Sequence, residues 1–437
     1  MSISQMFEEF IDNLAISNKQ MISDRYAELT KTLNKQFRDT DSETANTLQV
    51  GSFGRKTGIN GISDLDMLYI MPKASWDTYN NAQNGQYKLL SDTKEAILSR
   101  YSRTDVSVDR LVVTVTFSNF YIEVQPVFEQ EDGSFKYPDT KNGGSWKITK
   151  PRDEIDEISS ADESKNQNLR RLCKMARAWK NKHGVAMGGL LIDTLVYNFL
   201  NSTTDYDNKS YLYYDWLSRD FFKYLSELPE QDYYLALGSN QRVVVKKKFQ
   251  KDAKKAYELC LKAIEAKNNV NDKWKKIYGR PFPAQKEAVM EESLAATISK
   301  QWRNTEQFIE DRFPVDIREN LEIDCEVKQG GSFKFLLRHM PAFMQLKANK
   351  ELLFKITNIS VAKPYEIYWK VLNRGIEAQR KDCIRGQIEK DKGLQQKFEH
   401  TDFKGDHIVE CYCIKNGVVV AKDRIHVPIV TDGSNYD

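Results

Sequence analysis

The stretch from Gln49 to Pro72 constrains this chain more than any other. It contains a Gly-Ser turn at Gly51 and Ser52, a glycine-punctuated loop, and then Asp64 and Asp66 alternating with apolar residues. On a β-strand, residues two apart point to the same face and lie about 6.6 Å apart along the chain. The pattern therefore predicts a half-buried strand that holds two carboxylates side by side.

Two adjacent carboxylates repel each other unless a cation lies between them. Mg²⁺ is usually held by one or two carboxylates together with substrate phosphates. The Gly-Ser turn upstream offers small residues, backbone N–H groups and a hydroxyl, which suit phosphate oxygens. The stretch therefore indicates a metal site next to a phosphate site. The alternative is an acidic strand end beside a glycine-rich surface loop.

The order Gly-Ser, spacer, Asp-hydrophobic-Asp resembles the signature of the DNA polymerase β-like nucleotidyltransferases. This resemblance implies that Asp64 and Asp66 are catalytic metal ligands. It implies nucleotide-binding roles for Gln49, Gly51 and Ser52. It also implies a third carboxylate on a following strand.

Glu123 is the candidate for that third carboxylate. The pair Ser118-Asn119 predicts a tight turn, and the strand after it, residues 120–128, has Glu123 as its one acidic residue. A lone acid in an apolar strand costs free energy unless it is paired or bound to a metal. The family usually has Asp at this place, so Glu123 is a departure that adds one methylene. A strand-edge Glu that faces solvent is the alternative.

Helical periodicity marks the segments that surround this stretch. Residues 3–14 are expected to form a short helix, and Ser17 with Gln20 resembles a capping box that starts a long amphipathic helix to about residue 38. Residues 86–102 are expected to be helical and residues 106–117 to be rich in strand. Residues 138–152 are expected to be a loop.

Basic residues occur on a later predicted helix, Asn168 to Lys182. Lys174 and Arg177 are three residues apart and share a face beside its buried stripe. A cationic face of this kind suits a triphosphate, and the family carries basic residues on the matching helix. We therefore expect Lys174 and Arg177 to bind phosphate, with a solvated basic face as the alternative. Further helices are expected at 190–200, 213–226, 249–267 and 284–311.

The C-terminal part has a different character. Short alternating segments predict strands, and Asn416-Gly417 is a strong two-residue hairpin signal. Strands at this spacing favour a small β-sandwich. The segments Tyr365–Gly375 and Gly405–Tyr412 resemble the C-terminal sensor domain found beside bacterial adenylyl/guanylyl cyclases and second-messenger nucleotidyltransferases. The predicted strands are 333–338, 352–358, 365–372, 406–415, 417–422 and 424–430.

Together these features resemble the bacterial cGAS/DncV-like nucleotidyltransferases (CD-NTases, SMODS type) with a C-terminal sensor domain. The expected fold class is α/β (α+β): a polymerase β-like nucleotidyltransferase core with a helical second lobe, followed by a small β-sandwich. The expected domains are 1–155 for the catalytic lobe with its N-terminal spine helix, 156–315 for the helical lobe and 316–437 for the sensor-like domain.

Composition narrows the class of protein further. The chain has 437 residues, and its net charge of +3 is spread out, so long nucleic acid is not an expected partner. Its six cysteines form no Cys-x-x-Cys pair, which argues against structural zinc and favours reduced thiols. No long apolar run or signal pattern is present, so we expect a cytoplasmic protein that does not enter membranes.

The resemblance implies a function. It implies two Mg²⁺ ions, with Mn²⁺ possible, held by Asp64, Asp66 and Glu123, and ATP and GTP as substrates for a cyclic di- or oligonucleotide. It further implies antiphage (CBASS-type) signalling to a separate effector protein. Two alternatives stay open: a linear-oligonucleotide or RNA-end nucleotidyltransferase, and a catalytically decayed nucleotide sensor.

Overall fold

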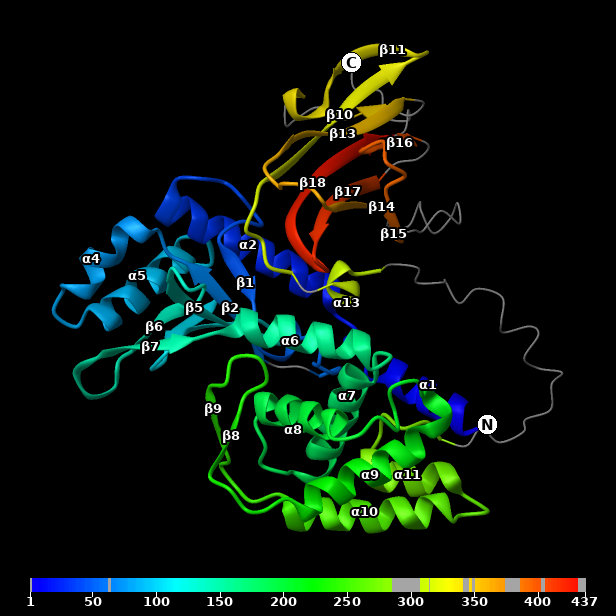
Figure 1. The fold of residues 1–437 in the computed structure, drawn as a ribbon. Helices are drawn as coiled ribbons and strands as arrows, with labels where there is room; N and C mark the ends of the chain where they lie inside the picture. Colours follow the sequence, from blue (N-terminus) through cyan, green and yellow to red (C-terminus); the bar gives the residue numbers. More distant parts are fainter. Residues whose placement is uncertain are drawn as a thin grey trace. The chain divides into compact units, whose positions relative to one another are not determined.

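The computed structural model describes residues 2–61, 64–284, 307–313, 315–340, 346–347, 350–373, 386–401 and 405–430. It divides into two compact units, which are described separately: residues 1–41 with 47–289, and residues 42–46 with 290–437 (Figure 1). The expected boundary near residue 155 lies inside the first unit, and the two largest hydrophobic cores of this unit are described in turn.

A mixed sheet forms the first of these cores. Its strand order is β1-β2-β5-β4-β3, with β6 paired to β5 and β7 paired to β6. The β2–β5 pair is parallel, and its neighbours on this path are antiparallel. The strands are β1 Thr47–Gln49, β2 Asp64–Ile70, β3 Asp105–Val108, β4 Val113–Thr116, β5 Tyr121–Glu129, β6 Phe135–Asp139 and β7 Ser145–Thr149.

Two helices cover one face of this sheet. Leu29 and Leu33 of α2 and Leu89 and Ile97 of α5 pack with alternate residues of β2, β4 and β5 (Figure 1). The spacing of these apolar residues predicts the helices, and burial of their stripe holds them on the sheet. The helices around this sheet are α2 Lys19–Arg38, α3 Gly51–Gly54, α4 Trp76–Asn80 and α5 Gly85–Arg100.

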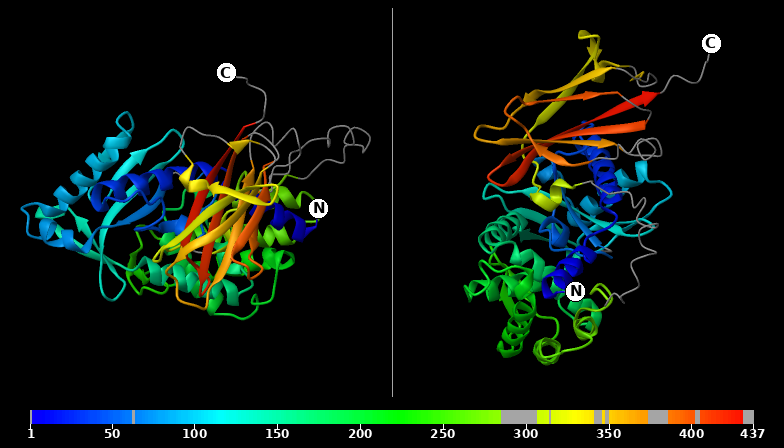
Figure 2. Two further views of the ribbon diagram at one scale, coloured as in Figure 1. Left: turned by 90° about the horizontal axis from the view of Figure 1, so that it is seen from above. Right: turned by 90° about the vertical axis from the view of Figure 1, so that its right-hand side faces the viewer.

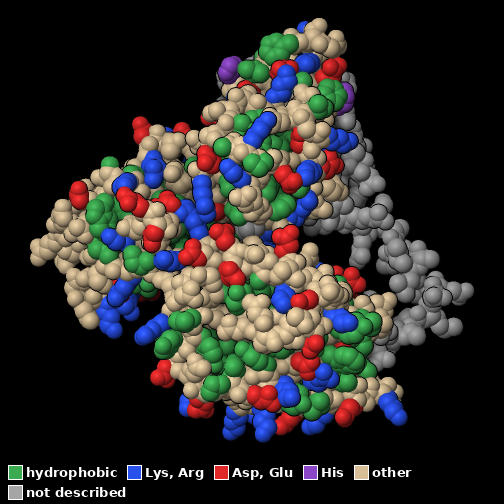
Figure 3. Space-filling view, in the orientation of Figure 1, with side chains coloured by type: hydrophobic (Ala, Val, Ile, Leu, Met, Phe, Trp, Pro, Cys, Tyr) green, Lys and Arg blue, Asp and Glu red, His purple; other side chains and the backbone are tan. Residues whose placement is uncertain are grey.

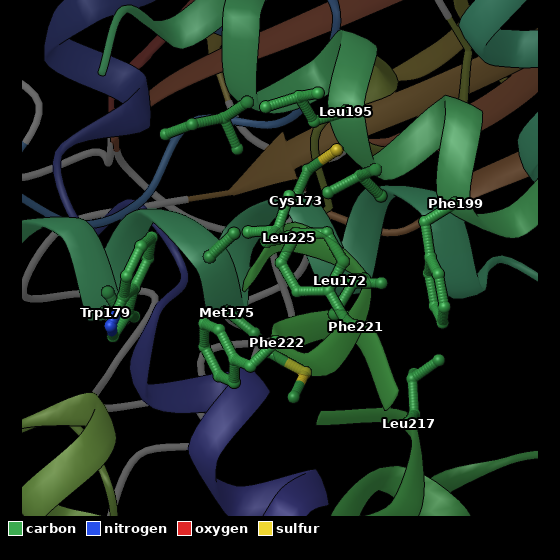
Figure 4. Packing of buried hydrophobic residues seen from close by; sticks show 14 of the residues in the cluster. Leu172, Cys173, Met175, Trp179, Leu195, Phe199, Leu217, Phe221, Phe222 and Leu225 are labelled. Carbon is green, nitrogen blue, oxygen red and sulfur yellow. The ribbon is translucent and has the colours of Figure 1, made fainter. Parts of the chain in front are cut away.

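The second core lies among helices. Figure 4 shows Leu172, Met175 and Trp179 of α7 facing side chains of α8 and α9. The N-terminal helix α1 packs here too, since Phe7 lies 5.0 Å from Trp274 between ring centroids. The helices of this lobe are α1 Ile3–Asn13, α6 Pro151–Ser164, α7 Asn168–His183, α8 Gly189–Asn201, α9 Tyr214–Glu227, α10 Gln250–Ile264 and α11 Val270–Tyr278, with a two-stranded sheet of β8 Tyr233–Leu235 and β9 Arg242–Val244.

The second unit is a β-sandwich, as expected. One sheet has the order β11-β10-β13-β16, the other β12-β18-β17-β14-β15, and Figure 2 shows the strands stacked in two layers. Residues from both sheets, among them Ile323, Phe354, Trp369 and Val427, form the core between them. The elements are α13 Ile309–Arg312, β10 Leu321–Gln329, β11 Ser332–Leu336, β12 Leu346–Lys347, β13 Glu351–Ile359, β14 Glu366–Asn373, β15 Ile388–Lys390, β16 Gln396–His400, β17 Gly405–Lys415 and β18 Val418–Val430.

Several local predictions are corrected by the structure. The capping box belongs to Ser2 and Gln5 at the start of α1, whereas α2 begins after Asn18 without a side-chain cap. Residues 145–149, expected in a loop, form β7 because they pair with β6. The two short strands expected at 417–422 and 424–430 are the single strand β18, and β10 was not predicted. Most of the helix expected at 284–311 lies outside the described residues.

Other local predictions are confirmed. The turn at Ser118-Asn119 joins β4 to β5, and Phe117 N donates to Phe120 O at 2.8 Å. Asn416 and Gly417 connect β17 to β18 with φ values of 52° and 74°, which the type I′ turn requires.

Acidic and basic side chains are interspersed over the face shown in Figure 3. No helix among the described residues is long and apolar enough to cross a membrane.

Candidate active site

Strand alternation places Asp64 and Asp66 together. Leu65, Met67 and Tyr69 of β2 are buried in the core under α2 and α5. Because successive strand residues point to opposite faces, Asp64 and Asp66 emerge on the other face. Asp64 is exposed and Asp66 is half-buried. This face of the sheet therefore carries the predicted carboxylate pair.

Glu123 joins this pair through the parallel register of β2 and β5. Asp66 lies directly opposite Glu123, and Asp64 lies opposite Tyr121. Ile122 and Val124, the neighbours of Glu123, are buried in the core under α2 and α5, so Glu123 emerges on the face that carries the aspartates. It is half-buried rather than exposed. The structure thus brings the three predicted carboxylates to one face.

The charges on this face disfavour one another. Burial raises the pKa of Asp66, and the carboxylate of Asp64 raises it further. Burial also raises the pKa of Glu123, followed by the charges of Asp66, Asp64 and Asp109. A cation on this face would relieve the repulsion. In the described ranges, no three His, Cys, Asp or Glu side chains converge as metal ligands do. The expectation that Asp64, Asp66 and Glu123 bind a metal therefore rests on the register of β2 and β5 and on the repulsion between the three carboxylates.

The Gly-Ser turn packs directly against Asp66. Gly51 opens the short helix α3 with φ +63°, and a Cβ built on it would stand 1.7 Å from Oδ2 of Asp66. Val50 N donates to the carbonyl oxygen of Asp66 at 3.1 Å. A side chain at position 51 is excluded both by the backbone conformation and by lack of space. The turn therefore needs glycine to lie this close to the carboxylate.

Gln49 and Ser52 flank this glycine. Gln49 ends β1, is buried, and lies opposite Met67 of β2. Ser52 is half-buried, and its carbonyl oxygen accepts from Thr57 N at 2.9 Å and Gly58 N at 3.0 Å. The loop after the turn is thus folded back onto it. Of the predicted nucleotide-binding residues, Gly51 lies against Asp66 and Ser52 follows it in the turn. Gln49 pairs with Met67, so it faces the core under α2 and α5 and not the face that carries Asp66.

The two basic residues of α7 have different surroundings. Lys174 is half-buried. Arg177 is buried, and its guanidinium donates to both oxygens of Asp193, at 2.6 and 2.9 Å, and to the carbonyl oxygens of Cys173 and Gly189. These bonds favour a structural role for Arg177 over the phosphate-binding role expected from the sequence.

The sequence reasoning missed the acidic partners of this region. Asp193 lies inside the apolar helix α8 and is fully buried, and Arg55 and Thr57 also donate to it. Two arginines lower the pKa of Asp193 to about 2, against the effect of burial. The signal that identified Glu123, a lone acid in an apolar segment, also marks Asp193 in the sequence.

The comparisons with known proteins identify two domains in the chain. Residues 1–162 match the Second Messenger Oligonucleotide or Dinucleotide Synthetase (SMODS) domain. Residues 303–430 match the Adenylyl/Guanylyl and SMODS C-terminal sensor domain. The search of curated proteins found no relative.

Solved structures resemble the chain at low identity. CdnC of Escherichia coli MS115-1 with ATP is 15% identical with TM-score 0.48 and covers 64% of this chain and 98% of its own. A mutant of the Vibrio cholerae di-nucleotide cyclase DncV is 12% identical with TM-score 0.45 and covers 64% and 87%. Elizabethkingia meningoseptica CdnE cyclic dinucleotide synthase with GTP and Apcpp is 15% identical with TM-score 0.42 and covers 61% and 100%.

The two domain matches together span more than half of the chain; apart from residues 42–46, the first lies in the first structural unit, and the second lies in the second unit. The chain is therefore a nucleotidyltransferase of the CD-NTase family, the cyclic di- and oligonucleotide synthases, with a C-terminal sensor domain.

Proposed function

We propose that this enzyme joins ATP and GTP into a cyclic di- or oligonucleotide second messenger in antiphage (CBASS-type) signalling. The observation that carries the chemistry is the position of Asp66, opposite Glu123 in the parallel β2–β5 pair and in contact range of the Gly51 turn. The cyclic product and its release to a separate effector protein rest on family membership.

Asp64, Asp66 and Glu123 would hold Mg²⁺, as two ions, with Mn²⁺ as a substitute. The donor set fits, since it consists of hard oxygen ligands and Asp66 and Glu123 have pKa values raised by burial and mutual repulsion. When bound, the metal neutralises phosphate charge and lowers the pKa of an acceptor hydroxyl.

The other residues of the site bind and orient the substrate. The backbone N–H groups of the Gly51–Ser52 turn and the Ser52 hydroxyl would hold phosphate oxygens, and Lys174 would add positive charge. Positioning of the acceptor hydroxyl and the triphosphate supplies most of the rate in phosphoryl chemistry. A carboxylate oxygen of the acidic face would accept the hydroxyl proton.

Each proposed transfer forms one bond to an α-phosphorus and breaks another. The deprotonated 2′- or 3′-oxygen of one nucleotide forms a bond to the α-phosphorus of the next, and the bond to the leaving pyrophosphate breaks. A second transfer within the linear intermediate closes the ring and releases another pyrophosphate.

Product analysis tests this proposal. The protein is incubated with all four nucleoside triphosphates and MgCl₂, and products are identified by mass spectrometry before and after nuclease P1 digestion. We expect a cyclic product containing adenosine, guanosine or both, and none from an Asp66→Asn variant that remains folded. A linear product, or one that appears only with added RNA, supports the alternative transferases. Absence of turnover supports a decayed sensor.

A further inference from the structure

A buried network of charged groups lies directly behind the Gly-Ser turn. Arg55, the residue after α3, donates through Nε to Oδ2 of Asp193 at 2.9 Å and through Nη1 to Oε2 of Glu154 at 3.1 Å. Thr57 Oγ1 donates to the same Asp193 oxygen at 3.0 Å. All four residues are buried, with exposed fractions of 5% or less. The network ties the loop after the turn to α6 and α8.

The backbone of Arg55 is also hydrogen-bonded, both to the Gly-Ser turn and to α7. Arg55 N donates to the carbonyl oxygen of Gly51 at 3.1 Å, and Arg170 Nε of α7 donates to the carbonyl oxygen of Arg55 at 3.2 Å. The residue is thus bonded on one side to the first residue of the Gly-Ser turn and on the other to three helices. Arg55 is therefore linked through this bond to Gly51, which lies against Asp66.

The chemistry of this link requires arginine. Two carboxylates on two different helices are bridged by one planar guanidinium, whose donors are fixed in direction. Lysine would keep the positive charge, but its ammonium group is compact. It lacks the planar arrangement of donors by which one guanidinium binds Glu154 and Asp193 in fixed directions. Because the charge is kept, Arg55→Lys leaves no unpaired buried acid, unlike a change to a neutral residue.

We propose that Arg55 is a positioning residue, which holds the Gly-Ser turn in the geometry that binds a nucleoside triphosphate. The nucleotide part of this inference rests on the proposed function. The mechanical part, that Arg55 fixes the turn against Asp66, stands on the contacts alone.

The test compares Arg55→Lys with Arg152→Lys in the full-length protein. Arg152 is also a buried arginine in an ion pair, with Glu129, and its guanidinium lies over the Phe135 ring at 4.6 Å. These contacts fix α6 to β5 and β6 rather than to the turn, so the variant controls for the general cost of the substitution. Amide hydrogen exchange and binding of adenosine 5′-(α,β-methylene)triphosphate with MgCl₂ are measured for both variants.

We expect Arg55→Lys to speed exchange at least tenfold in the peptide that covers residues 50–58, and to raise the Kd for the analogue at least tenfold. Arg152→Lys should leave both within about twofold of wild type. Thr57→Val, which removes one bond of the same network without a charge, should shift both readouts in the direction of Arg55→Lys and serves as the test if Arg55→Lys does not fold.

Equal exchange at residues 50–58 in the two lysine variants would overturn the inference, as would an unchanged Kd. Failure of the proposed function gives a different result: wild type then neither binds the analogue nor makes product, while the exchange comparison still decides whether Arg55 holds the turn.

Discussion

Gly51 and Asp66 are packed so closely that a single added carbon on Gly51 would stand 1.7 Å from the Asp66 carboxylate. We expect Gly51→Ala to lower the rate of pyrophosphate release about 100-fold, because shifts of about 1 Å in a reacting group have effects of that size. Gly133→Ala is the matched control, since Gly133 has φ +78° but open space around it. Equal rates in the two variants would contradict the prediction, since the close approach of Gly51 to Asp66 would then have no effect of its own.

The acidic face predicts a response to divalent cations that needs no turnover. The folded-state pKa of Asp66 is raised, so its ionised form opposes folding at neutral pH. In EDTA we expect Asp66→Asn to have a higher thermal midpoint than wild type, and MgCl₂ to raise the midpoint of wild type but not that of Asp66→Asn. The exposed-site variant Asp77→Asn should behave like wild type in both buffers. A cation response that persists in Asp66→Asn would place the binding site elsewhere.

The basic residues of α7 are expected to separate into two roles. Lys174→Ala should raise KM for the nucleotide with little change in kcat. Arg177→Met should instead lower the free energy of unfolding by about 3–5 kcal/mol, the usual cost of removing one partner of a buried ion pair. Steady-state kinetics and urea unfolding of both variants measure the difference. If Arg177→Met folds normally and loses nucleotide affinity, the phosphate-binding role predicted from the sequence holds.

The buried network also predicts sensitivity to acid. The folded pKa of Asp193 is about 2, below its ordinary value of 3.8. A lowered carboxyl pKa stabilises the fold above the unfolded pKa, and this contribution, roughly 2 kcal/mol, is lost as the pH falls from about 4 to about 2. Urea unfolding at a series of pH values measures this loss.

The salt dependence of stability distinguishes the contribution of Asp193 from that of a second carboxylate, Asp139. Asp139 also has a pKa lowered to about 2, but its partner Arg110 is half exposed, so about 0.5 M NaCl should weaken its contribution. Asp139→Asn removes that contribution and should leave the Asp193 part intact at high salt. A loss of stability that disappears entirely in salt would contradict the buried origin.

The sequence by itself determined the main helices and the acidic face. The apolar spacing of α2, α5 and α7 fixes those helices, and the alternation of Asp64 and Asp66 fixes their common face, because each depends only on the local period of a helix or a strand. The one acidic residue among the apolar residues 120–128 likewise identified Glu123 before its partner strand was known.

Only the tertiary structure decided which charges meet. Arg177 has the sequence context of a phosphate ligand, yet it is bound to Asp193 of the next helix, and Arg55 reaches acids on α6 and α8. These contacts join residues that are 16, 99 and 138 positions apart in the chain. A local period carries no information on them, because they depend on how whole helices pack against the sheet and its loops.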